Sequence, residues 1–333
     1  MSGKPQDNDM TSAKLMVEDD KEHLPLCVAS APFDDPSKAD IVLRSSDNVD
    51  FYVFGCILAI ASPEVFAPML SLPQPVESPS ADGVDKELPI VDVSETSSTL
   101  RPILELCYPL TAPLTFASFD HAKDVLHALH KYQILWPWDP IITPLMSHIR
   151  EHPLRMYAVA VRLAFDDLAQ LAAYTSLLHG DLYQYCVELD GISGTDFQRV
   201  VIYRKRAVAA LSHFSARWLP TTVTPPGPGG SRWVWLTCRG CISHRRNCVN
   251  GPCKCGVAQW FTDYWRVIQE TLRATPCAPA LKQPVVVSAT LALSGTVDCG
   301  TCKAAIAKDI PQYLELLEDE LNKRISEIKL KEN

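Results

Sequence analysis

The feature that most constrains the fold is an early change of hydrophobic period. Two short runs rich in β-branched and aromatic residues, 40–44 and 50–54, flank a turn-forming segment that contains Asp and Asn. From Ile57 onward apolar residues recur at helical spacing, and Pro63 suits the first position of a second short helix. This order predicts a β-hairpin that leads directly into two small helices.

Further along, the chain predicts one more short strand and a series of amphipathic helices. A loop rich in Pro and Ser over 72–89 overlaps the start of the strand expected at 88–93. Helical periodicity then marks segments near 100–108, 118–129, 142–149, 154–161, 168–178 and 196–214. A hairpin, a returning strand and helical hairpins indicate the α+β fold class, a short β-sheet with clustered α-helices.

The length of the chain and its changes in composition indicate several regions. At 333 residues it favours about two domains, and 47% hydrophobic with 21% charged residues is typical of folded proteins. The first 22 residues have no apolar run, so they predict neither a signal peptide nor a membrane span. We expect a disordered tail over 1–35, a folded domain over 36–150, a helical extension over 151–218, a Pro/Gly linker over 219–232 and a Cys-rich C-terminal region over 233–333.

The C-terminal region is expected to be a small α/β unit. The run Trp233–Leu236 is β-prone, and 257–272 has helical spacing. A strong amphipathic helix is expected over 311–330, where Leu and Ile form an apolar stripe.

Cysteine usage and charge indicate an intracellular protein. Nothing directs the 12 cysteines into an oxidising compartment, so we expect reduced thiols or metal ligands in the cytoplasm or nucleus. The net charge of -8 argues against general attraction to nucleic acid or anionic lipid.

Two Cys-x-x-Cys pairs are the strongest candidate site. Cys238 with Cys241 and Cys299 with Cys302 would complete a four-cysteine zinc site, because each pair can grip one tetrahedral ion. His244 and Cys248 offer a local alternative. The long interval between the pairs and the surplus of ligands favour ordinary buried or free thiols, so structural zinc stays a hypothesis.

We expect no enzyme and no other cofactor. Neither Asp nor Glu occurs between Cys238 and Cys255, so a zinc ion there would lack a general base. The sequence contains no phosphate-binding glycine motif and no Gly-x-Ser-x-Gly elbow.

The segment from Asp40 to Ile149 resembles the BTB/POZ family, particularly the BTB-domain proteins abundant in mushroom-forming fungi. The resemblance is carried by short pieces in one order, namely Ala39–Leu43, Phe51–Val53, Ile57–Pro63, Val65–Phe66, Leu72–Pro75, Leu88–Val91, Cys107–Pro109 and Lys131–Tyr132. It implies protein-protein interaction, since BTB domains commonly self-associate, and some bind cullin-type ubiquitin-ligase scaffolds or transcriptional corepressors.

The chain departs from the family pattern at one place. Phe54 and Gly55 stand where the family has a His-Lys pair, so Asp40 lacks its basic neighbour. These three residues are candidate interaction residues. The helices after Pro153 look like the extension that often follows a BTB domain, and paired cysteines also occur in the C-terminal region of the fungal proteins.

Three functions follow as hypotheses. The first is a scaffold that self-associates and recruits other proteins, and the second is a substrate adaptor of a cullin-type ubiquitin ligase. The third, a zinc-containing nucleic-acid regulator using Arg239, Arg245, Arg246 and Lys254, ranks lowest.

Overall fold

The structure, a computed structural model, describes residues 25–72, 88–108, 114–134, 139–179, 184–212, 233–241 and 257–331. The chain forms two compact units, which we call the N-terminal unit (1–110 with 132–136) and the C-terminal unit (111–131 with 137–333). The expected domain end near residue 150 stays a prediction.

The N-terminal unit contains a four-stranded sheet in the order β1-β3-β2-β4. Its strands are β1 (Cys27–Val28), β2 (Ile41–Arg44), β3 (Val49–Val53) and β4 (Ile90–Asp92). The antiparallel pair β2 and β3 is the predicted hairpin, and β4 joins β2 in parallel. A parallel pair needs a long crossover, which here includes α1 (Gly55–Ala61) and α2 (Phe66–Ser71). The hairpin and the strand near Ile90 thus share one sheet, which confirms the α+β class.

Polar side chains fix the hairpin and the helix that follows the sheet. Asn48, at the turn, has a φ of 58°, a conformation that Asn tolerates better than most residues. Arg44 donates to both carboxylate oxygens of the buried Asp50, at 2.7 and 2.9 Å. The turn residue Asp47 accepts from the backbone N–H of Ser97 at 2.7 Å, which secures the start of α3 (Ser97–Cys107).

Ser62 and Tyr132 close the N-terminal unit. The Ser62 hydroxyl is buried, accepts from the Phe66 N–H at 3.1 Å and donates to the Tyr132 carbonyl. The Tyr132 ring stacks on Phe66 with 4.5 Å between ring centroids, and its hydroxyl donates to Glu95. A residue distant in sequence therefore completes the core beside α2.

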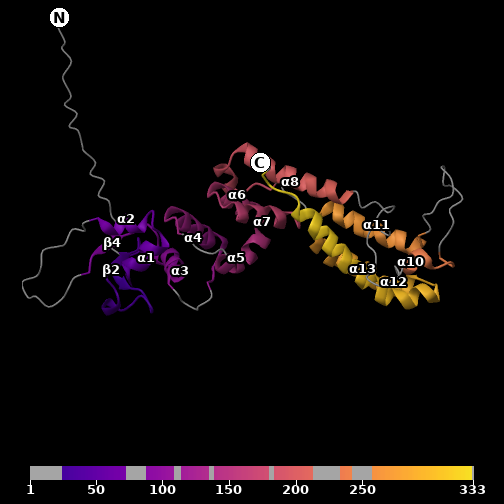
Figure 1. The fold of residues 1–333 in the computed structure, drawn as a ribbon, viewed down its shortest axis with the longest axis horizontal. Helices are drawn as coiled ribbons and strands as arrows, with labels where there is room; N and C mark the ends of the chain where they lie inside the picture. The colour runs from indigo at the N-terminus through magenta and orange to yellow at the C-terminus, as the bar shows by residue number, and fades with distance from the viewer. Residues whose placement is uncertain are drawn as a thin grey trace, which may run out of the picture. The chain divides into compact units, whose positions relative to one another are not determined.

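The described part of the C-terminal unit is helical (Figure 1). Its α-helices are α4 (Phe119–Lys131), α5 (Asp139–Glu151), α6 (Pro153–Arg162), α7 (Asp166–Ser176), α8 (Gly194–Ser212), α10 (Val234–Thr237), α11 (Gln259–Ala274), α12 (Pro284–Thr296) and α13 (Gly300–Ser326). The C-terminal unit also contains two short 3-10 helices, η2 (Val187–Gly191) and η3 (Ala278–Lys282). A third, η1 (Pro36–Lys38), lies in the N-terminal unit. The periodic segments expected from Ala122 to Leu211 are confirmed as helices.

The predicted α/β character of the C-terminal region is wrong for its described residues, 233–241 and 257–331, which contain no strand. Trp233 precedes a single helical turn, α10, because the two tryptophans of this run pack against α11 and α13 instead of pairing with a strand. Helix α13 begins at Gly300, well before Pro311, which lies inside it and is exposed.

Arg204 joins α8 to the helices on either side. Its guanidinium donates to the carbonyl of His179 at 2.7 Å and to the carbonyl of Ala274 at 2.6 Å. Arg204 therefore contributes one structural bridge within the C-terminal unit. Of the disordered tail expected over 1–35, residues 1–24 lie outside the described residues, whereas 25–35 are described, with β1 paired to β3 and Phe33 buried. The linker expected over 219–232 also lies outside the described residues.

Candidate functional site

The first cysteine pair lies on a turn at the end of α10. Cys238 caps this helix, and its N–H donates to the Val234 carbonyl at 2.9 Å. The Cys241 N–H then donates to the Cys238 carbonyl at 3.1 Å. This turn brings both thiols to one side of the backbone, as a Cys-x-x-Cys ligand pair requires.

The second pair lies at the start of α13. Cys299 is the N-cap residue, and its carbonyl accepts from the Lys303 N–H at 2.8 Å, while Cys302 lies in the first turn. The first turn of a helix has backbone N–H groups without helical partners, which favours negative charge on a sulfur placed there.

The four sulfurs converge. Cys238 and Cys299 lie with their Sγ atoms 3.6 Å apart, and the Sγ atoms of Cys302 and Cys241 are also 3.6 Å apart. All four Sγ atoms lie within 4.8 Å of one another, so they can hold a metal ion. Zinc-sulfur bonds of about 2.3 Å in a tetrahedron put neighbouring sulfurs about 3.8 Å apart, close to the observed spacing.

The surroundings of the sulfurs separate their pKa values. The pKa of Cys299 is lowered to about 6, because the Cys302 backbone N–H and the Cys241 and Cys238 thiols hydrogen bond to its sulfur. Burial raises the pKa of Cys302 and of Cys241, and the nearby Trp260 side chain opposes part of that rise at Cys302. The first negative charge of the cluster therefore settles on Cys299, at the start of α13.

An aromatic cluster supports the first cysteine pair. Trp235 stacks on Phe261 with ring centroids 4.2 Å apart and meets Tyr313 edge-on at 5.3 Å. The Val234 N–H donates to Asp309 at 3.0 Å, and the Ala258 N–H donates to the Trp235 carbonyl at 2.9 Å. These contacts hold α10 between α11 and α13, so that Cys238 and Cys241, which follow α10, face the cysteines at the start of α13.

Sequence spacing identified these four cysteines as candidate ligands, and the structure brings all of them together. His244 and Cys248, the local alternative, lie outside the described residues. Sequence reasoning did not single out Trp260 as a neighbour of Cys302. Trp260 belongs to the aromatic run of α11, which gave no signal that it lies near a thiol.

The candidate interaction residues lie together where α1 begins. The Gly55 N–H donates to Asp40 Oδ1 at 2.6 Å, so this carboxylate has a backbone partner at the start of α1. The Phe54 N–H contacts the Tyr108 hydroxyl at 2.6 Å, and 39% of the Phe54 side chain is exposed. A Cβ added at position 55 would lie 3.3 Å from the flexible end of the Leu70 side chain, so a larger residue there would require Leu70 to shift.

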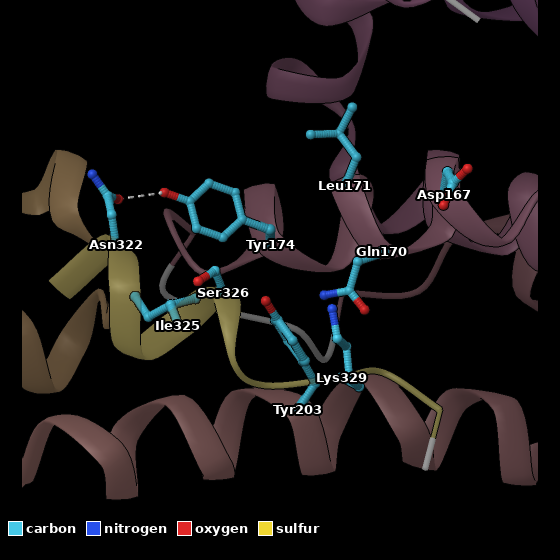
Figure 2. Close-up of a pocket in the computed structure, with 9 residues that line it drawn as sticks. All are labelled: Asp167, Gln170, Leu171, Tyr174, Tyr203, Asn322, Ile325, Ser326 and Lys329. Atoms are coloured by element: carbon cyan, nitrogen blue, oxygen red, sulfur yellow. Dashed lines mark hydrogen bonds between the residues drawn. The ribbon is translucent and has the colours of Figure 1, made fainter. Parts of the chain in front are cut away.

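A cavity of about 450 Å³ lies elsewhere in the C-terminal unit, between α7, α8 and the end of α13 (Figure 2). Tyr174 points toward Asn322, with 3.4 Å between its hydroxyl and the amide oxygen. Gln170 accepts from the Leu330 N–H at 2.9 Å. Two residues that line the cavity thus bind α13 and the residues after it: Tyr174 binds Asn322, and Gln170 binds Leu330. We therefore interpret the cavity as a crevice between packed helices.

A scan against protein-family models and searches of curated proteins and of solved structures return no match. The resemblance to the BTB/POZ family therefore rests on the residues quoted above. Among the described residues, no helix is both long and apolar enough to cross a bilayer.

Proposed function

We propose that this chain is a non-enzymatic protein-interaction scaffold with a structural zinc centre in its C-terminal unit. Cys238, Cys241, Cys299 and Cys302 bind the ion, and the BTB/POZ-type N-terminal unit binds other proteins, including a second copy. The observation that carries the zinc centre is the convergence of four sulfurs from two separate segments. Four thiolate ligands fill a tetrahedral shell and leave no open position, which favours a structural role.

Metal content tests the centre directly. The purified chain is expected to contain one zinc ion per molecule by elemental mass spectrometry, and Cys302→Ser is expected to lose it. Cys56→Ser is a matched control, because this thiol lies on α1 in the N-terminal unit. Zinc retained in Cys302→Ser, or zinc absent from the wild type after purification without chelator, would contradict the proposal.

Exposed apolar side chains of the N-terminal unit support its role in association. Ile60 on α1 is 81% exposed, and Leu72, after α2, is 62% exposed. Large apolar groups exposed in this way commonly mark contact surfaces. Their position beside the BTB-like hairpin favours protein partners.

Ile60→Asp is expected to weaken self-association of the chain about 30-fold or more, because it places a charge at the centre of an apolar contact. Analytical ultracentrifugation over a concentration series measures the effect. Ser98→Asp, an exposed residue at the start of α3, adds the same charge and is expected to behave like the wild type. Equal association of both variants and the wild type would show that Ile60 does not lie in the self-association surface.

The alternative function, a substrate adaptor of a cullin-type ubiquitin ligase, predicts that the chain binds a purified cullin N-terminal domain in a pull-down.

A further inference from the structure

Helix α12 is unusual because its 13 residues include none that is charged. Val286 and Leu293 are buried on one side, where α12 packs against α11 and α13. Figure 1 shows α12 alongside α13 in the C-terminal unit. On the opposite side Leu291 is 71% exposed and Val287 is 44% exposed. Most surface helices carry polar or charged residues on their outer face, so α12 presents an apolar face that the described residues leave exposed.

The centre of this face has a protruding side chain beside small ones. At 100° per residue, Leu291 points opposite the buried line, flanked by Gly295 and Ser288. A Cβ added at Gly295 would meet nothing within 4 Å. Glycine destabilises a helix relative to alanine, and the packing of the described chain gives no reason for it here. An outside surface that approaches closely would give such a reason.

We propose that the α12 face, defined by Val287, Ser288, Leu291 and Gly295, binds the same face of a second copy. A two-fold contact brings the same patch of both copies together, so charged residues of one sign within the patch would repel each other, and α12 has none in a chain with net charge -8. Leu291 of one copy fills the space over Gly295 and Ser288 of the other. A strongly basic, acidic or nucleic-acid partner would call for charges that this face lacks.

This contact is independent of association through the N-terminal unit. A molecule with two different two-fold contacts forms assemblies larger than dimers. Removing one contact leaves dimers held by the other, and removing both leaves monomers. Failure of one surface is thereby distinguishable from failure of the other.

Sedimentation of the wild type and four variants tests the arrangement. Leu291→Asp is expected to weaken the α12 contact on the order of 100-fold and to leave dimers, whereas Ile60→Asp leaves dimers of the other kind. The double variant is expected to be monomeric. Because Leu291 is mostly exposed, the substitution leaves folding intact, which circular dichroism checks. Asn322→Asp on α13 adds the same charge at an exposed position off this face and is expected to sediment as the wild type.

A photoreactive amino acid at position 291 identifies what covers the face. Cross-linked peptides joining residue 291 to α12 of a second copy are expected. Cross-links only to another segment of the same chain, a wild-type assembly unchanged by Leu291→Asp, or recovery of residue 291 only with lipid or foreign protein would each overturn the proposal. A wild-type dimer that Leu291→Asp alone makes monomeric would sustain it even without association through the N-terminal unit.

Discussion

Replacing Cys302 by serine is expected to disorganise the packing of α10 against α11 and α13. Metal binding and folding are coupled wherever a site forms only in the folded chain, and structural zinc contributes about 10–16 kcal/mol in zinc-finger peptides. Here α11 and α13 keep apolar packing of their own, so we expect a loss of about 4 kcal/mol or more, or roughly 10 °C in the unfolding midpoint. Thermal unfolding followed by near-ultraviolet circular dichroism measures this, because the signal reports the aromatic cluster.

The position of the aromatic cluster explains the size of this effect. The buried indole N–H of Trp265 and the buried Tyr313 hydroxyl have no hydrogen-bond partner among the described residues. Each such group costs about 1–3 kcal/mol unless surrounding packing offsets it. The short helix α10 has only four residues and cannot persist alone. Its anchoring therefore depends on its aromatic contacts together with the cysteine centre at its end.

Cys277→Ser is the matched control for this prediction. Cys277 is fully buried next to η3, and burial raises its pKa to about 11, so it is an ordinary buried thiol away from the cluster. Its replacement is expected to cost about 1–2 kcal/mol and to leave the zinc content unchanged. A Cys302→Ser protein no less stable than Cys277→Ser would contradict the assignment of Cys302 as a metal ligand.

The hairpin and the long helices were predictable because their patterns are local. The β-prone runs 41–44 and 49–53 flank a turn that contains Asn48. The helical spacing of apolar residues in α3 and α4 can be read directly in the sequence. Parallel pairing of β4 with β2 was not contained in any local pattern, since it depends on a crossover between distant strands. Local periodicity specifies individual helices and strands, whereas the pairing of distant strands depends on the core that they share.

The C-terminal region shows where such prediction fails. Helix α12 is apolar on nearly every face, so it has no helical period to detect. Trp233 and Trp235 match strand composition, but their large rings are buried by packing on Phe261 and Tyr313. The cysteine pairs were visible from their spacing, and their pairing across 61 positions required coordinates.

Replacing Glu188 by glutamine is expected to destabilise the C-terminal unit by about 3 kcal/mol at neutral pH, because it breaks a largely buried ion pair. Arg155 donates to both Glu188 oxygens, at 2.9 and 2.6 Å, and only 6% of the Glu188 side chain is exposed. The guanidinium also lies 4.0 Å from the centroid of the Phe119 ring, so η2 and α6 are joined to α4 through one cation. Glutamine keeps the shape of the side chain and removes the buried negative charge that faces Arg155, which leaves the exposed Asp120 as its charged partner.

The pH dependence of this effect has a definite sign. Hydrogen bonds from Arg155 lower the pKa of Glu188 below its ordinary value of 4.5. A lowered folded-state pKa means that the stabilisation is complete above the unfolded-state pKa and is lost as pH falls through the folded-state value. The difference between wild type and Glu188→Gln in urea unfolding is therefore expected to be full at pH 7 and to shrink steadily below pH 4.5.

Asp120→Asn separates this pair from ordinary surface charges. Asp120 also lies near Arg155, at 3.2 Å, but 65% of its side chain is exposed. Exposed pairs contribute about 0–1 kcal/mol, so this variant is expected to differ little from the wild type. If both variants lost the same free energy of unfolding, burial would not be the source of the effect, and the link from η2 through Arg155 to α4 would be no stronger than any surface contact.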